Sequence, residues 1–211
     1  MLDAAGAAAF ERAIAVGELA IFPADTVYGI AAAPDDEAAV ARLNALKERD
    51  PAQPSGVMFF AVEHAAPLLH ALGPRTRAAC AALLPGPVTL VLPNPAGRYP
   101  LACGATPERI GLRVPALAGA LAPLAAVGIP VVQSSANLRG GPDPRRLADV
   151  PAPLRAAAAV ALDGGELPGV ASTVVDLCGY EESGEPAVLR VGALPADELA
   201  RRIAAAPSGR A

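Results

Sequence analysis

Short apolar runs alternate with longer amphipathic segments along most of the chain, and glycine, proline and aspartate separate them. The apolar runs have the length of strands, and we predict strands at Leu19–Phe22, Val57–Phe60, Val88–Leu92, Ile110–Val114, Ile129–Gln133, Val160–Leu162, Thr173–Leu177 and Ala187–Leu189. The amphipathic segments predict helices at Asp3–Val16, Asp36–Lys47, Glu63–Leu72, Pro74–Leu84, Ala116–Ala126, Pro151–Ala158 and Ala196–Ala205. This alternation predicts an α/β fold with helices packed around one sheet.

The length of 211 residues suits one domain. We expect residues 1–206 to form that domain and residues 207–211 to be a disordered tail. No apolar run approaches the length that crosses a bilayer, and Asp3, Glu11 and Arg12 interrupt the segment that a signal peptide would keep apolar. We therefore expect a cytoplasmic protein without membrane association.

The charge argues against a protein that coats nucleic acid, and the cysteine content argues against a metal-binding protein. The net charge is -4 and aromatic residues make up 3% of the chain, which is unfavourable for a protein that coats nucleic acid. Cys80, Cys103 and Cys178 are widely separated and lack the spacing of metal ligands. We expect no protein-held metal centre.

A first polar cluster ends the apolar strand in FPADTVYGI, residues 22–30. Asp25 and Thr26 can make local hydrogen bonds in a turn after the strand. They can equally face a ligand, because ligands of open α/β sheets collect where strands end.

A second feature is the pair Lys47 and Arg49 at the end of a predicted helix. Two cations there can stabilise the helix C-terminus. They can also embrace a polyphosphate, which arginine contacts through a planar fork and lysine as a point charge. The sequence leaves both roles open.

Three further segments place polar groups beside strands. In VVQSSANLRGG, residues 131–141, Ser135 and Asn137 follow an apolar strand and can form either a plain turn or a polar nest for an anion. Ser172 precedes another strand, and Arg113 and Arg190 stand at the ends of two more. Arg113 can also be an ordinary surface cation.

The common signatures of nucleotide-binding loops, dinucleotide folds, serine hydrolases and zinc proteases do not occur in the sequence. Taken together and in order, however, the polar segments resemble the YrdC-like family from about Gly17 to Gly192. Lys47-x-Arg49 followed by Ser135-x-Asn137 matches the hallmark of that family. The remaining matches are the blocks PGPVTLVL, GLRVP, STVVDL and VLRVGAL.

The resemblance implies a twisted mixed sheet, with parallel and antiparallel strands, helices packed around it and a concave, cationic ligand-binding face. It also implies a nucleotidyltransferase that joins L-threonine, bicarbonate and ATP into threonylcarbamoyladenylate and pyrophosphate. A separate transferase would then modify tRNA. Mg²⁺, held mainly through the ATP phosphates, would be the cofactor.

The resemblance also implies roles for individual residues. Lys47 and Arg49 would carry catalysis by stabilising charge. Candidates for ATP binding are Lys47, Arg49, Asn137 and Arg190, with Gln53 and Arg145 as weaker ones. Candidates for L-threonine binding are Thr26, Arg113, Ser135 and Ser172.

Four positions depart from the family pattern, and they put the amino-acid specificity in question more than nucleotide use. They are Ala24, Ala31, Asp50 and Met58. Two alternatives stay open: a double-stranded RNA- or ribosome-binding module of the same fold, with RNA bound weakly, and a paralogue that makes another carbamoyl adenylate.

Overall fold

The computed structural model describes residues 2–206, and in this range the strands form one nine-stranded mixed sheet. The strand order is β7-β1-β2-β6-β3-β5-β4-β8-β9. The pairs β1/β7, β3/β5 and β4/β8 are parallel, and the other neighbours are antiparallel. The predicted mixed α/β sheet is therefore confirmed. The strands are β1 (Ala20–Pro23), β2 (Tyr28–Ala32), β3 (Gly56–Met58), β4 (Val88–Pro93), β5 (Arg109–Arg113), β6 (Val131–Ser135), β7 (Val160–Ala161), β8 (Thr173–Asp176) and β9 (Ala187–Arg190).

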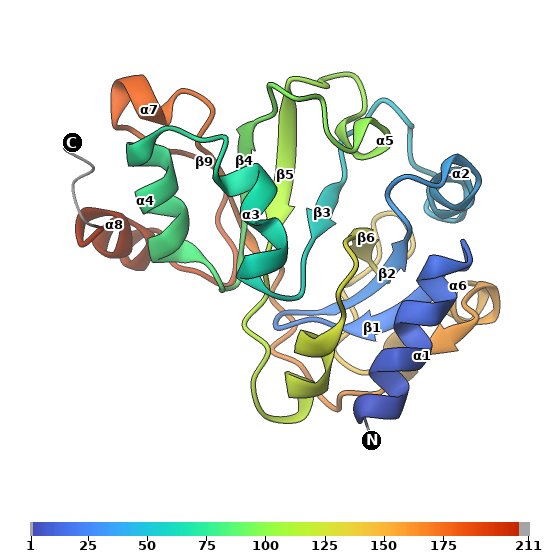
Figure 1. The fold of residues 1–211 in the computed structure, drawn as a ribbon. Coiled ribbons are helices and arrows are strands. Elements are labelled where there is room, and N and C mark those ends of the chain that lie inside the picture. Colours follow the sequence, from blue (N-terminus) through green and yellow to red (C-terminus); the bar gives the residue numbers. More distant parts are fainter. Residues whose placement is uncertain (1, 207–211) are drawn as a thin grey trace.

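Helices lie at both ends of this sheet, and α3 and α5 lie between those ends in Figure 1. At one end α4 packs against α7 and α8, and at the other α1 contacts β1 and β7. The α-helices are α1 (Ala4–Ala15), α2 (Glu37–Leu46), α3 (Ala66–Leu69), α4 (Pro74–Leu83), α5 (Pro100–Cys103), α6 (Ala152–Ala157), α7 (Tyr180–Ser183) and α8 (Ala196–Ala204). Short 3₁₀ helices are η1 (Val62–Ala65), η2 (Gly119–Ala126) and η3 (Leu147–Asp149).

The helix predicted at Ala116–Ala126 is wrong in type and in its start. The segment forms the 3₁₀ helix η2, which begins at Gly119 and contains Pro123. Proline has no backbone N–H and clashes with the preceding turn of an α-helix, so the regular ladder cannot run through this position. The apolar pattern of the segment is compatible with either helix.

Strand β2 was not predicted, because in its sequence YGIAA a glycine and two alanines weaken the strand propensity of Tyr28 and Ile30. It forms an antiparallel hairpin with β1, in which Phe22 pairs with Gly29 and Pro23 with Tyr28. The Asp25–Thr26 segment is consequently the turn of this hairpin, and β2 continues into the sheet by pairing with β6.

A cluster of three aromatic rings fixes α1 on the sheet. The ring centroids of Phe10 and Phe22 are 5.3 Å apart, those of Phe10 and Phe60 are 5.6 Å apart, and those of Phe22 and Phe60 are 5.8 Å apart. All three side chains are buried. Edge-to-face and tilted contacts at these separations are favourable beyond the burial of apolar area, so the cluster anchors the N-terminal helix.

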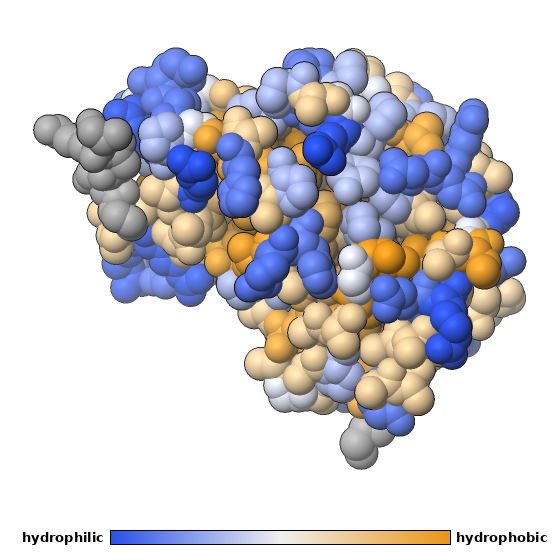
Figure 2. Space-filling model, in the orientation of Figure 1, coloured by the Kyte–Doolittle hydropathy of each residue, from blue (hydrophilic) through white to orange (hydrophobic). Residues whose placement is uncertain are grey.

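The surface is mixed in hydropathy, as Figure 2 shows for one face, where hydrophilic residues lie among pale orange ones. Alanine explains part of the pale colour, since Ala4, Ala5 and Ala8 are exposed on α1. None of the helices within residues 2–206 has the length and apolar character needed to span a bilayer. The predicted tail, residues 207–211, lies outside the described residues, and the predicted extent of the domain stays a prediction.

Candidate active site

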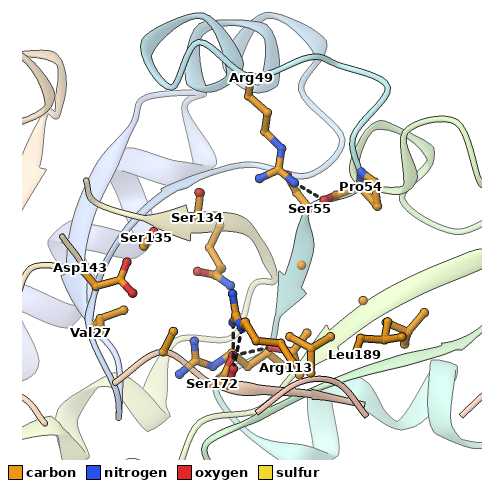
Figure 3. A pocket seen from close by; sticks show the side chains of 18 of the residues that line it. Val27, Arg49, Pro54, Ser55, Arg113, Ser134, Ser135, Asp143, Ser172 and Leu189 are labelled. Atoms are coloured by element: carbon orange, nitrogen blue, oxygen red, sulfur yellow. Dashed lines mark hydrogen bonds between the residues drawn. The ribbon is translucent and has the colours of Figure 1, made fainter. Parts of the chain in front are cut away.

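A pocket of about 520 Å³ opens on the face of the sheet, over strands β3, β4, β5, β6, β8 and β9 (Figure 3). This volume is typical of sites for small molecules. Figure 3 shows Arg49 entering from the loop after α2, while Arg113 and Ser172 lie on the opposite side. The charged lining residues in the described part of the chain are Arg49, Arg109, Arg113, Asp143 and Arg190.

The loop after α2 brings Arg49 to the pocket. Lys47 is the C-terminal cap of α2, and Glu48 then adopts a left-handed conformation with φ of 47°, which turns the chain. The Arg49 guanidinium donates through Nη2 to the carbonyl oxygen of Pro54, and its Nε–H is buried without an acceptor. Burial lowers the pKa of Arg49 from its usual value. A half-buried cation with an unused, buried donor is suited to an anionic ligand.

Lys47, the only lysine in the chain, ties α2 to the loop that follows β6. Its Nζ donates to the carbonyl oxygens of Ser135, at 2.7 Å, and Asn137, and to Asn137 Oδ1 at 2.7 Å. Burial is the main cause that lowers its pKa to about 8; Arg49 lowers it further and Asp143 opposes the shift. Lys47 does not itself line the pocket, and here its side chain positions the loop.

Asn137 organises the same loop. Its Oδ1 accepts from Ser135 Oγ at 2.8 Å, and its Nδ2 donates to the Gly141 carbonyl oxygen at 2.7 Å and to Asp143 Oδ1 at 3.3 Å. Ser135 and Asp143 line the pocket, whereas Asn137 lies behind them. The Ser135-x-Asn137 segment, for which the sequence left a plain turn and a polar nest open, is a hydrogen-bonded segment at the edge of the pocket.

A buried ion pair holds Arg113 in another wall of the pocket, and its partners Asp25 and Thr26 lie behind it, outside the lining. Arg113 Nη2 donates to Asp25 Oδ1 and to Thr26 Oγ1, both at 2.5 Å, and the side chains of Arg113 and Asp25 are only 4% and 8% exposed. The other Asp25 oxygen accepts from the Ala116 amide at 3.0 Å. Arg113 is therefore not a surface cation, and its buried Nε–H has no acceptor.

Ser172 and Arg190 meet at the outer end of the pocket. The Ser172 carbonyl oxygen accepts from Arg190 Nε at 3.2 Å and from Nη2 at 2.8 Å. The Ser172 hydroxyl lies 2.8 Å from Thr89 Oγ1. Both residues line the pocket, so Arg190 can still turn part of its guanidinium toward a ligand.

The two weaker candidates lie outside the pocket lining. Gln53 is exposed on the loop before β3. Arg145 donates through Nε to the Leu167 carbonyl oxygen at 3.2 Å, and its Nη2 lies 3.1 Å from Glu166 Oε1. Their proximity to a nucleotide stays a prediction.

The sequence did not single out Arg109, Asp143 or Gln133 as candidate site residues, and all three line the pocket. Arg109 pairs with Asp176 and donates through Nε to Cys178 Sγ at 3.2 Å. Alternation along β5 was the available signal, because positions two residues apart share one face of a strand. Arg113 therefore predicts that Arg109 points the same way.

Comparison with known proteins supports one family. The family model that covers Sua5, YciO and YrdC, described as "Telomere recombination", matches residues 12–192. The threonylcarbamoyl-AMP synthase of Chromohalobacter salexigens is 39% identical over 80% of this chain and 89% of its own length.

Two solved structures share the fold. Sua5 of Pyrococcus abyssi complexed with L-threonine has a TM-score of 0.82 and 29% identity, covering 98% of this chain. This chain spans 59% of the length of that Sua5 chain. YciO of E. coli has a TM-score of 0.76 and 20% identity, covering 92% of each chain, and shows the fold alone.

Proposed function

The chain belongs to the Sua5, YciO and YrdC family, and from this membership we propose that it is a threonylcarbamoyl-AMP synthase. Such an enzyme joins L-threonine, bicarbonate and ATP into threonylcarbamoyl-AMP and pyrophosphate, with loss of water. The curated relative from Chromohalobacter salexigens carries that name, and the Pyrococcus abyssi homologue was solved with L-threonine bound.

The observation that carries the proposal is a pair of arginines with unused buried donors in one pocket. Arg49 and Arg113 reach the pocket from different elements, and each has a buried Nε–H without an acceptor. An unsatisfied buried polar group costs about 1–3 kcal/mol, more when it is charged. A ligand whose anionic groups draw these side chains into new hydrogen bonds recovers that cost, and ATP and a carbamate both supply such groups.

The reaction needs little from the protein beyond placement and charge. The threonine amine attacks the carbon of CO₂ or bicarbonate, and a carbamate oxygen then attacks the α-phosphorus while pyrophosphate leaves. Two anions must approach each other, so cations that neutralise them lower the barrier. Arg49 and Arg190 suit the phosphates. Arg113 and Ser172 suit threonine or its carbamate, and the buried Thr26 holds the Arg113 guanidinium in place.

The residues present fit a magnesium ion that is held mainly by phosphates. Asp143 is the one carboxylate among the described lining residues, and Mg²⁺ commonly takes one or two carboxylates together with substrate phosphates and water. Within residues 2–206 no cluster of three or more histidine, cysteine, aspartate or glutamate side chains could hold a metal by itself. We propose that Asp143 supports Mg²⁺, which would neutralise phosphate charge when bound.

We also propose that the product passes to a separate transferase that modifies tRNA. This step, the use of bicarbonate and any weak RNA binding belong to the proposal as a whole. RNA binding depends on cations that are free to neutralise phosphates, but two arginines of the pocket are paired with carboxylates, Arg113 with Asp25 and Arg109 with Asp176. No feature of the described residues therefore favours an RNA- or ribosome-binding role over catalysis. These two ion pairs reduce the net positive charge of the pocket region.

The test is the release of pyrophosphate from Mg·ATP by the purified chain. Release should require both L-threonine and bicarbonate, and other amino acids should not replace threonine. Arg49→Ala should weaken ATP binding by about 1.5–3 kcal/mol, because a charge-assisted contact is lost. Arg155→Ala is the matched control, since Arg155 is exposed on α6, outside the pocket lining, and donates to the Ala148 carbonyl oxygen. Absence of threonine-dependent release of pyrophosphate would refute the proposal. The ATP affinity of Arg145→Ala would decide whether Arg145, the weaker candidate, contacts the nucleotide.

A further inference from the structure

Two glycines lie side by side in the floor of the pocket. Gly56 on β3 pairs in parallel register with Gly111 on β5, and both line the pocket. Glycine weakens the interior of a strand and is found there at bulges, at tight bends, or where a ligand or another backbone approaches closely. The β3/β5 pair has no bulge, and a Cβ at either position would lie no closer than 3.4 Å to a backbone atom of another strand. Close approach of a ligand therefore accounts better for the two glycines.

The protein itself does not require glycine at either position. Neither residue is among the glycines with positive φ, so backbone conformation does not demand it. A Cβ on Gly111 would lie 3.4 Å from the Gly56 Cα, and one on Gly56 would lie 3.4 Å from Gln133 Nε2, as their nearest neighbours. These are ordinary contacts, so alanine would fit the fold. The space that glycine leaves open belongs to the pocket.

The surroundings of this floor indicate what fills the space. Val91 pairs with Gly111 on the neighbouring strand, and Val174 and Leu189 continue the apolar wall from β8 and β9. None of the described lining residues is aromatic, so a planar ring finds no side-chain ring to stack on. The arginines lie around this region, with Arg49 and Arg113 on opposite sides in Figure 3.

We propose that Gly56 and Gly111 form a bare backbone floor on which the purine ring of ATP lies, and that a side chain at either position displaces it. This inference rests on the proposed use of ATP and adds two residues that determine the shape of the site. A ring that lies flat on the two Cα atoms gains contact over its whole face, while its phosphates extend toward the cations.

The experiment compares Gly56→Ala and Gly111→Ala by calorimetric titration with Mg·ATP and with inorganic tripolyphosphate, which has no base. Each variant should raise the Kd for ATP by about tenfold to a hundredfold, the usual cost of overpacking, and leave the Kd for tripolyphosphate unchanged. Gly179→Ala is the matched control, because a Cβ there meets no atom within 4 Å and the residue lies outside the pocket lining.

The possible results separate the two proposals. If the unaltered chain does not bind ATP, the proposed function fails. If it does and both variants bind ATP with unchanged affinity, the purine floor is refuted. Equal loss of ATP and tripolyphosphate also refutes it, since the floor would then serve the phosphates. Thermal unfolding should be unchanged or raised in both variants, and failure of both to fold would overturn the claim that the protein has room for a methyl group.

Discussion

The buried amine of Lys47 should make the affinity for ATP depend on pH. Its side chain is 8% exposed, and burial lowers its pKa from 10.5 to about 8. A polyphosphate bound nearby would favour the charged form and restore a higher pKa. Above pH 8 the free protein must therefore take up a proton when ATP binds. We expect the Kd for ATP to rise about tenfold for each pH unit above 8, or about 1.4 kcal/mol per unit.

The lowered pKa of Lys47 also makes the free energy of unfolding depend on pH, and the direction follows from the number of protons bound in each state. Between pH 8 and 10.5, unfolded Lys47 binds more protons than folded Lys47, so the free energy of unfolding should rise with pH in this window. Below pH 8 both states are protonated and this contribution no longer varies. The buried ammonium thus lowers stability at neutral pH, and a polyphosphate bound beside it would offset that cost.

The assay can read Lys47 directly, because the chain contains one lysine. Selective ¹³C labelling of lysine gives a single side-chain NMR signal, which we expect to titrate near pH 8 in the folded protein and at a higher pH with Mg·ATP. A urea-unfolded sample provides the reference. Lys47→Met should bind ATP more weakly and without the added pH dependence.

Two results would contradict this reasoning. A folded-state midpoint near the ordinary lysine value would show that burial does not destabilise the ammonium. An ATP affinity that changes equally with pH in Lys47→Met and in the unaltered chain would assign the dependence to another group.

Two further predictions concern the stability of the fold. Arg113→Met leaves the Asp25 carboxylate buried without its cationic partner, so the free energy of unfolding measured in urea should fall by about 3–5 kcal/mol. Adding Asp25→Asn to this variant should restore part of that loss. A loss below about 1 kcal/mol would contradict a desolvated ion pair. Phe10→Ala should lower the free energy of unfolding by about 3–5 kcal/mol in the same measurement. Val16→Ala, at a residue 76% exposed, should change that free energy little. Equal effects of the two variants would show that the aromatic cluster does not anchor α1.

Much of the fold followed from the sequence because periodicity is a local property. The predicted strands at Val88–Leu92 and Thr173–Leu177 correspond to β4 and β8, and both are rich in β-branched residues. Strand β2 escaped prediction because pairing on both sides, with β1 and β6, compensates for its weak propensity. Such compensation is tertiary, and a single sequence does not display it.

In the candidate site, too, the sequence indicated individual residues but not their partners in the folded protein. Arg49, Arg113, Ser135, Ser172 and Arg190 line one pocket as strand-end polarity and family resemblance suggested. The pairing of Arg113 with Asp25 could not be predicted, because 88 residues separate the partners. The acceptors of Lys47 are likewise set by the path of the loop after β6. Strand-end polarity and resemblance thus pointed to five residues of the pocket lining but not to Arg109, Gln133 or Asp143, while the hydrogen-bond partners of each residue required coordinates.

The position of Lys47 beneath the loop after β6 makes its amine a natural reporter of motion. As long as the carbonyl oxygens of Ser135 and Asn137 hold Nζ, acylating reagents in solvent have little access to it. Modification can proceed only in moments when the loop lifts away, so its rate records how often that opening occurs. Since the chain has no other lysine, the α-amino group is the one competing amine.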